Sequence, residues 1–173
     1  MKKIVLFLLL GISVTAEAQL KNINQLITYS TYTYTQMEQM LGKKFWHNQE
    51  TGKMDSINYT RWIPQVLTPA NVGDCFMIFY KKKAAPLDYL VYQTINKDTF
   101  KKYMAEVKSS GFQFSNSENK PSKKTEFYVK GKYGLSIITG REKPTDSLMY
   151  IFGVKVLPAN KIPAVAAPPK KKK

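Results

Sequence analysis

The sequence predicts an α+β fold in which a tandem α-β4 repeat forms an approximately eight-stranded antiparallel sheet with helices on one face. Three observations favour this class. Segments with helical periodicity are each followed by four short runs that are rich in β-branched and aromatic residues. Glycine, proline and serine separate these runs. Similar residues also recur at fixed spacings in the two halves of the chain.

The two ends of the chain differ in composition from its centre. Two lysines precede an apolar run over residues 4–14, and small residues ending in Ala18 follow it, which is the pattern of a signal peptide over residues 1–18. The run is shorter than the roughly 20 residues of a membrane anchor, so we favour cleavage over retention. At the other end, residues 158–173 contain four prolines and finish in four lysines, which is typical of a flexible, solvated tail. We therefore expect one folded domain over residues 19–157.

The first repeat, residues 20–96, is expected to begin with helix. Helical spacing of apolar residues starts at Ile23, and helix is predicted to continue through residues 29–35, although the β-branched and aromatic residues there also favour strand. Thr35 and Glu38 have the spacing of a capping box for a second helix. Four strand-like runs follow, at residues 45–48, 57–63, 75–82 and 89–95.

The second repeat, residues 97–157, has the same order of elements. Asp98 and Thr99 are candidate caps for an amphipathic helix that ends before Gly111. Four strand-like runs follow, at residues 112–117, 125–130, 133–141 and 147–156. The last run is apolar at both odd and even positions, which predicts a central strand or a strand whose outer face is covered by a partner.

Residue matches support a duplication, although short strands of similar composition can also match by coincidence. Pro86, Asp88, Leu90 and Tyr92 recur 58 positions later as Pro144, Asp146, Leu148 and Tyr150. Asn48, Glu50 and Tyr59 have counterparts 68 positions later in Asn116, Glu118 and Phe127. The change in spacing places an insertion between Trp62 and Cys75, in a stretch with two prolines and a glycine. We expect that stretch to be a loop, where insertions are tolerated.

Two short motifs carry a resemblance to known proteins. The chain resembles a group of uncharacterised small exported bacterial proteins in its Lys43-Lys44-Phe45-Trp46 turn and its Tyr59-Thr60-Arg61-Trp62 strand. The tandem helix-and-sheet architecture is also similar to that of the secreted beta-lactamase inhibitor proteins, whose concave sheet face grips a protein. The disulfides of the inhibitor family are absent from this chain, which has one cysteine, so we carry over no inhibitory residues.

The composition excludes several kinds of chemistry. A single cysteine and a single histidine rule out a disulfide framework within the chain and a histidine-based metal centre. The sequence has no phosphate-binding loop, nucleophile elbow or dinucleotide-binding glycine pattern. Cys75 and His47 could form a nucleophile and base pair, but Cys75 lies in an apolar strand, where a cysteine usually acts as a small buried hydrophobe. We therefore expect no enzyme activity, cofactor or metal, with a Cys75-dependent enzyme as an alternative.

Binding is the function class that the sequence favours. We expect an exported, periplasmic or secreted module of the cell envelope that recognises a protein or a glycan through the sheet face opposite the helices. Aromatic residues and arginine supply contact area at a low entropic cost and are enriched in interfaces. The competing interpretation of each ring is that it fills the core. The candidate ligand-binding residues are Trp46, Arg61, Trp62, Tyr80, Tyr128 and Tyr150.

A second binding hypothesis rests on the formal net charge of +15. Lysine clusters could hold the protein to anionic envelope polymers, although lysines in turns and at sheet edges also prevent aggregation. Further basic segments include residues 120–124, and nucleic acid ranks lower as a partner because export removes the usual target. The lysines assigned to this role are Lys81, Lys82, Lys83, Lys170, Lys171, Lys172 and Lys173.

Overall fold

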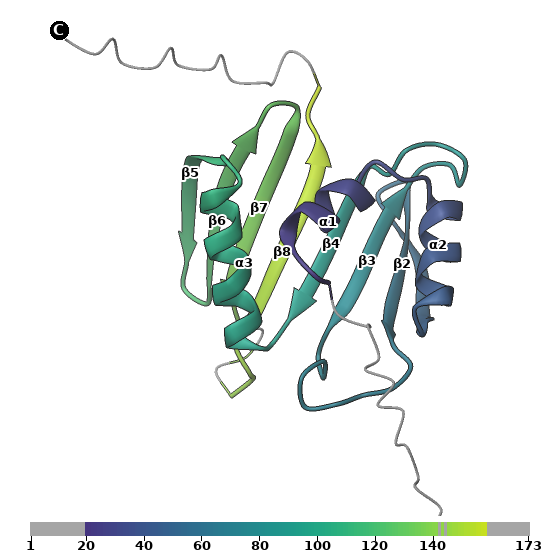
Figure 1. Cartoon of the computed structure of the whole chain (residues 1–173), viewed down its shortest axis with the longest axis horizontal. Helices are drawn as coiled ribbons and strands as arrows, with labels where there is room; N and C mark the ends of the chain where they lie inside the picture. Colours follow the sequence, from purple (N-terminus) through teal and green to yellow (C-terminus); the bar gives the residue numbers. More distant parts are fainter. Residues whose placement is uncertain (1–19, 142, 144, 159–173) are drawn as a thin grey trace, which may run out of the picture.

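The computed structural model describes residues 20–141, 143 and 145–158 (Figure 1). The predicted signal peptide and all but the first residue of the predicted tail lie outside this range. The first half contains α1 (Ile23–Tyr29), α2 (Tyr34–Lys43), β1 (Trp46–Met54), β2 (Ile57–Pro64), β3 (Cys75–Tyr80) and β4 (Tyr89–Thr94). The second half contains α3 (Lys97–Ser109), β5 (Gln113–Lys120), β6 (Lys123–Lys130), β7 (Tyr133–Gly140) and β8 (Met149–Val156). These elements confirm the predicted α+β class and every predicted strand.

The eight strands form one antiparallel sheet in the order β1-β2-β3-β4-β8-β7-β6-β5. Each half therefore places its first strand at an edge and its last strand at the centre, where β4 pairs with β8. The predicted central position of the last strand is confirmed. The ten residues that separate β2 from β3 form a loop, as the change in repeat spacing predicted.

Both edge hairpins contain a bulge at a corresponding place. The bulge lies between Asn48 and Glu50 in β1 and between Phe114 and Asn116 in β5, so it recurs after 66 residues. The spacing of 68 that the sequence match predicted for this hairpin is wrong by two residues. Aligning identical residue types missed the bulge, because a bulge is a feature of backbone pairing rather than of side-chain type.

All three helices cover the same face of the sheet. Phe76 and Tyr80 are four residues apart on β3 and therefore point to one side, and the register places Tyr92 and Phe152 on that side too. The ring contacts that join helices to this face are Tyr29–Phe76, Tyr34–Tyr80 and Tyr103–Phe152, with centroids 6.4, 4.2 and 5.5 Å apart. Ring contacts from α1, α2 and α3 thus all reach the same face of the sheet.

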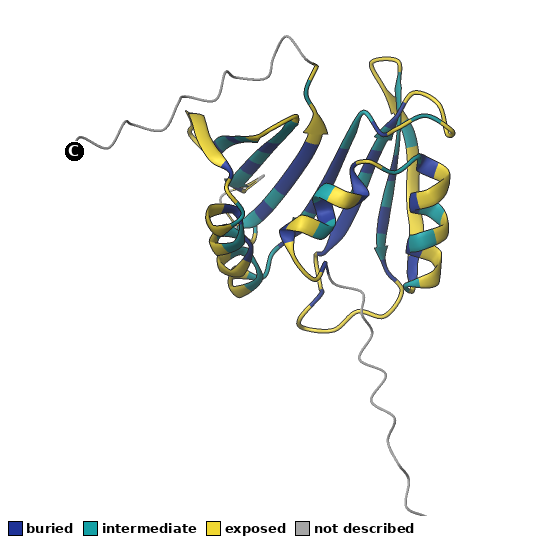
Figure 2. Cartoon of the chain, turned by 45° about the horizontal axis from the view of Figure 1, so that its top comes forward, coloured by how far each residue is buried: buried dark blue, intermediate teal, exposed yellow. Residues whose placement is uncertain are grey.

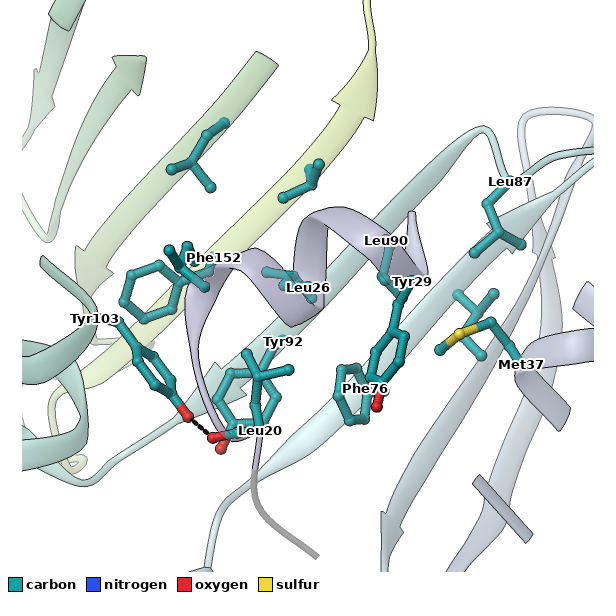
Figure 3. Close-up of a cluster of buried hydrophobic side chains, with 14 of the residues drawn as sticks. Leu20, Leu26, Tyr29, Met37, Phe76, Leu87, Leu90, Tyr92, Tyr103 and Phe152 are labelled. Atoms are coloured by element: carbon teal, nitrogen blue, oxygen red, sulfur yellow. Dashed lines mark hydrogen bonds between the residues drawn. The ribbon is translucent and has the colours of Figure 1, made fainter. Parts of the chain in front are cut away.

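The core lies between the helices and the sheet and extends across both halves. Figure 2 shows the buried segments of the strands beneath the helices. In the close-up of Figure 3, Leu26 of α1 lies near Tyr92 of β4 and Phe152 of β8, where the halves meet. All three side chains are fully buried. Because α1 covers the junction, the two repeats share one hydrophobic cluster and form one domain.

The starts of two helices differ from the sequence prediction. The predicted capping box at Thr35 is wrong: the hydroxyl of Thr33 accepts a hydrogen bond from the amide of Gln36, whose side chain accepts one from the amide of Thr33. This start places the Tyr34 ring in a stack on Tyr80, an inter-element contact that local sequence does not reveal. Likewise, Asn96, and not Asp98, caps α3.

The predicted continuous helix through residues 29–35 is also interrupted. α1 ends at Tyr29, and residues 30–32 form a turn before α2 begins. Within the described residues, no helix is both long enough and apolar enough to cross a bilayer.

Candidate binding face

The sheet surface opposite the helices, which we call the helix-free face, carries a row of aromatic side chains. Tyr59, Phe79 and Tyr89 lie on the neighbouring strands β2, β3 and β4 and are directly paired in the register. Their ring centroids are 6.1 and 5.8 Å apart, and each side chain is partly exposed. These three residues form the aromatic row. Large apolar rings that remain partly exposed on a sheet face are typical of a surface that contacts a ligand.

Tyr89 extends the row across the junction of the two halves. Its hydroxyl lies 2.7 Å from the Ser136 hydroxyl of β7. The Tyr89 side chain therefore passes over Gly153 of the intervening strand β8. A Cβ atom at Gly153 would lie 1.7 Å from the Tyr89 oxygen, so only glycine fits beneath the ring. Burial raises the pKa of the Tyr89 phenol, which stays protonated at neutral pH. The hydrogen bond therefore holds the ring against the sheet.

A pocket of about 690 Å³ opens on the helix-free face beside Tyr89. Gly134 and Gly153 contribute to its lining, and their missing side chains leave space that the Leu157 side chain and the Tyr89 ring occupy. Asp88, Asn116, Glu118 and Lys155 supply polar groups. Pockets of this size and composition hold small molecules or a few side chains of a partner. The apolar lining comes from both halves of the chain and includes Ile57, Phe79, Phe127, Val129 and Leu157.

Five of the six ligand-binding residues predicted from the sequence do not lie on this face. The prediction that these rings project from the sheet face opposite the helices is wrong, because the register and ring contacts place them on the helix-covered face. Tyr80 stacks on Tyr34, and Tyr150 stacks on Phe100 of α3 at 4.2 Å. Arg61 lies on the helix-free face, and Tyr128 contributes to the lining of the pocket although its ring contacts Phe114 on the other face. The five buried residues are Trp46, Trp62, Tyr80, Tyr128 and Tyr150, none of which is more than 8% exposed.

The physical reason is that several strands are apolar at both odd and even positions. In β3, Phe76 and Phe79 are of the same type, yet Phe76 is buried under α1 and Phe79 lines the pocket. Alternation identifies the buried face only where the other face is polar. No local signal distinguished the aromatic row from the core rings. Recurrent glycines in two adjacent strands, Gly134 and Gly153, were the one available indication of a close approach on this side.

Cys75 and His47 do not form the nucleophile pair considered from the sequence. β2 lies between the strands that carry them, so two strand spacings of about 4.8 Å separate the backbones. Cys75 is buried, and burial raises the pKa of its thiol. The neighbouring Arg61 opposes this rise only in part. A protonated, buried thiol is a poor nucleophile.

A buried polar cluster that the sequence did not indicate lies where the loop before β3 meets β4. Asp74 is 2% exposed, and its Oδ2 accepts a hydrogen bond of 2.7 Å from the Tyr92 hydroxyl. Its Oδ1 has no hydrogen-bond partner among the described residues. Burial raises the pKa of Asp74 to about 6, and hydrogen bonds from Thr94 and Tyr92 oppose the rise. Nearby, Tyr103 donates a hydrogen bond to the Leu20 carbonyl, which fastens the start of the described chain to α3 (Figure 3).

The lysines predicted to act electrostatically are only partly placed by the structure. Lys81, Lys82 and Lys83 are exposed in the turn that follows β3. The Lys81 ammonium lies 3.5 Å from Asp88, and that of Lys83 lies 5.2 Å from the centre of the Tyr34 ring. Residues 170–173 lie outside the described residues.

Comparisons of the chain with protein-family models, with curated proteins and with solved structures give no match. The geometry of the helix-free face is therefore the basis for the functional argument.

Proposed function

We propose that this protein is an exported, non-enzymatic binding module of the cell envelope that recognises a protein or a glycan through its helix-free face. The observation that carries the proposal is the pocket of about 690 Å³ beside the aromatic row. Its lining combines apolar side chains from both halves with a few polar groups, which is the usual composition of a binding site. The signal-peptide pattern of residues 1–18 supports export, and the burial of Cys75 counts against a thiol nucleophile.

Of the two partner classes, a protein fits the geometry better. The rings of the aromatic row are tilted by 36° and 41° relative to one another, so they do not form a flat platform for a chain of sugars. The apolar pocket beside them can instead receive a hydrophobic side chain from a partner. Anchors of this kind, seated in a pocket, dominate the energy of many protein interfaces. A glycan is the second candidate, which the same variants test.

Two phenylalanines on adjacent strands provide a matched pair of variants. Phe127 of β6 lines the pocket, whereas Phe114 of β5 lies on the opposite face and is 56% exposed. Each is replaced by alanine and used with the wild-type protein to recover partners from an envelope extract at about 0.15 M and about 0.5 M salt, where charge interactions are increasingly screened. The recovered partner is then purified and titrated against the three proteins.

We expect the wild type and Phe114→Ala to retain the same partner at both salt concentrations. Phe127→Ala should weaken binding by about tenfold, because a pocket without this ring buries less apolar area against the partner's anchor. Circular dichroism and thermal unfolding of each variant show whether the fold is intact. Equal binding by both variants, or no partner that depends on Phe127, would contradict the proposal.

A further inference from the structure

The loop between β2 and β3 exposes apolar side chains at one end of the sheet. Figure 1 shows this loop extending beyond the ends of both strands. Among the described residues, seven large apolar side chains are exposed, and four of them lie in this loop or beside its start. We call these four residues the apolar tip: Phe45, Val66, Leu67 and Val72, which are 43–59% exposed. None of them lines the pocket on the helix-free face.

Hydrogen bonds hold the apolar tip in a defined arrangement. The amide of Gln65 donates a hydrogen bond of 2.7 Å to the Phe45 carbonyl, which places Phe45 beside the start of the loop. Within the loop, the side chain of Asn71 is 3% exposed. It donates a hydrogen bond of 3.0 Å to the Val66 carbonyl and accepts one of 2.7 Å from the Thr68 amide. The loop therefore presents its apolar side chains from a fixed backbone.

The composition of the loop is unusual for an exposed segment. Residues 63–73 contain no charged residue, although 23% of the whole chain is charged. Exposed loops are normally polar, and a run of exposed apolar residues is unfavourable unless it has a function. Single apolar side chains on a surface need no explanation, but a group of four at one end of a sheet indicates an interaction site.

Phe45 adopts a backbone conformation that its residue type disfavours. Its φ is +60°, in the left-handed region, where a bulky side chain is strained and glycine or asparagine is more usual. Its side chain is 52% exposed, so burial in the core offsets little of this strain. An exposed ring that is kept in a strained position indicates that the ring contacts something outside the chain.

Lysines flank the apolar tip on two sides. Lys43, the last residue of α2, is exposed two positions before Phe45. On the other side, a Cβ atom at Gly73 would lie 3.0 Å from the Ile95 side chain, so the end of the loop packs against the segment that leads into α3. The first residue of α3 is Lys97, which is also exposed. Both lysines are therefore close to the base of the loop.

Acidic groups compensate little of this charge. Asp74, the only acidic residue of the loop, is 2% exposed. The carboxylate of Asp98 lies beside Lys97 in the sequence, but it is 3.8 Å from the Lys101 ammonium of the same helix. The surroundings of the apolar tip thus carry a positive charge, which favours a negatively charged partner.

We propose that the apolar tip contacts an anionic lipid surface and inserts its side chains among the lipid headgroups, a function additional to recognition by the helix-free face. Interfacial sites combine apolar side chains, which enter the boundary of the acyl chains, with lysines that are attracted to anionic headgroups. A projecting tip can enter a fluid lipid surface as it stands, whereas a protein partner would need a pocket shaped to receive it. The lipid surface therefore fits both the shape and the charge of this end.

The test measures flotation of the mature protein with vesicles of equal parts phosphatidylcholine and phosphatidylglycerol, and with vesicles of phosphatidylcholine alone, at about 0.15 M salt. The site variant carries Val66→Ser and Leu67→Ser. The control variant carries Met54→Ser and Val156→Ser, which replace apolar residues that are 55% and 42% exposed at the other end of the sheet. A third variant, Phe45→Asn, replaces the ring by a residue type that tolerates the left-handed conformation. Circular dichroism and thermal unfolding check that each variant is folded.

We expect the site variant to bind the mixed vesicles about tenfold more weakly than the wild type, because less apolar area enters the lipid, and the control to differ by less than about twofold. Phe45→Asn should bind at least about threefold more weakly, with a thermal midpoint no lower than that of the wild type, since the backbone strain is relieved. The wild type should bind phosphatidylcholine vesicles about tenfold more weakly than mixed vesicles, because the lysines then meet no net negative charge.

Several results would overturn the proposal. Equal weakening of the site and control variants would do so, as would the absence of wild-type binding to the mixed vesicles. Equal binding to both kinds of vesicle would contradict an anionic surface. A Phe45→Asn variant that is less stable yet binds like the wild type would show that the ring serves the fold. If the site variant kept its affinity for vesicles but lost a protein recovered from an envelope extract, the apolar tip would bind a protein and the proposal would be wrong.

Discussion

Replacement of Asp74 by asparagine should change how the stability of the fold depends on pH. Asp74 is buried beside Tyr92 with one carboxylate oxygen unpartnered among the described residues, and its pKa is raised to about 6. An unfolded aspartate has a pKa of about 3.9. A carboxyl whose pKa is raised by folding stabilises the native state while it is protonated, and this contribution is lost as its proton leaves. The contribution of Asp74 is therefore complete below about pH 4 and lost as the pH rises through about 6.

The magnitude follows from the size of the shift. A difference of about two pKa units corresponds to about 3 kcal/mol of unfolding free energy, and almost complete burial leaves little solvent screening to reduce it. Asparagine keeps an oxygen for the Tyr92 hydroxyl but cannot ionise. Its uncharged amide has its own packing and hydrogen-bonding cost, which is the same at every pH. The unfolding free energy of Asp74→Asn, relative to that of the wild type, should thus rise by about 3 kcal/mol between pH 4 and pH 7.

The assay is urea unfolding at pH 4, 5, 6 and 7, followed by the fluorescence of Trp46 and Trp62, both of which are buried in the first half. The quantity to compare is the difference in unfolding free energy between Asp74→Asn and the wild type at each pH. Contributions of the other acidic groups cancel in this difference, since both proteins contain them. A difference that stays constant from pH 4 to pH 7 would refute the assigned environment of Asp74.

Two further predictions concern the helix-free face and the cysteine. Gly153→Ala should destabilise the fold by about 1–3 kcal/mol, because the new Cβ would overlap the Tyr89 hydroxyl. Gly42→Ala in α2 should instead stabilise the fold by about 0.5–1 kcal/mol, because a Cβ at that position meets no atom within 4 Å. Thermal unfolding of both variants checks this, and a neutral Gly153→Ala would contradict the close approach of Tyr89. The Cys75 thiol should react with an aromatic disulfide reagent at least about 100-fold more slowly in the native protein than in urea, because it is buried and its pKa is raised. Equal rates in the two states would contradict the buried position.

Local patterns were sufficient to predict where the strands and the main helices lie. Short apolar runs bounded by glycine, proline and polar turns correspond to all eight strands. The run over residues 147–156 was apolar on both sides, and it forms the central strand β8. These predictions succeeded because strand positions and breakers depend on residues close together in the chain.

Details that depend on contacts between elements could not be predicted in this way. Thr33 and Thr35 are both acceptable caps, each with a suitable partner three residues later, and the stack of Tyr34 on Tyr80 accompanies the start that the structure adopts. The basic segment over residues 120–124 was evident, but its meeting with Arg141 depends on the pairing of β6 with β7. Asp74 gave no local sign of its burial.

The amino-acid sequence alone thus determined the fold class, the order of strands along the chain and the surplus of positive charge. Only the tertiary structure decided which aromatic rings face the helices and which remain accessible. Trp62 and Tyr59 lie on one strand, three residues apart, yet Trp62 is buried in the core and Tyr59 belongs to the aromatic row. The reason is physical: a strand that is apolar on both sides can be buried by either side, and the choice is made by the helices that pack against the whole sheet.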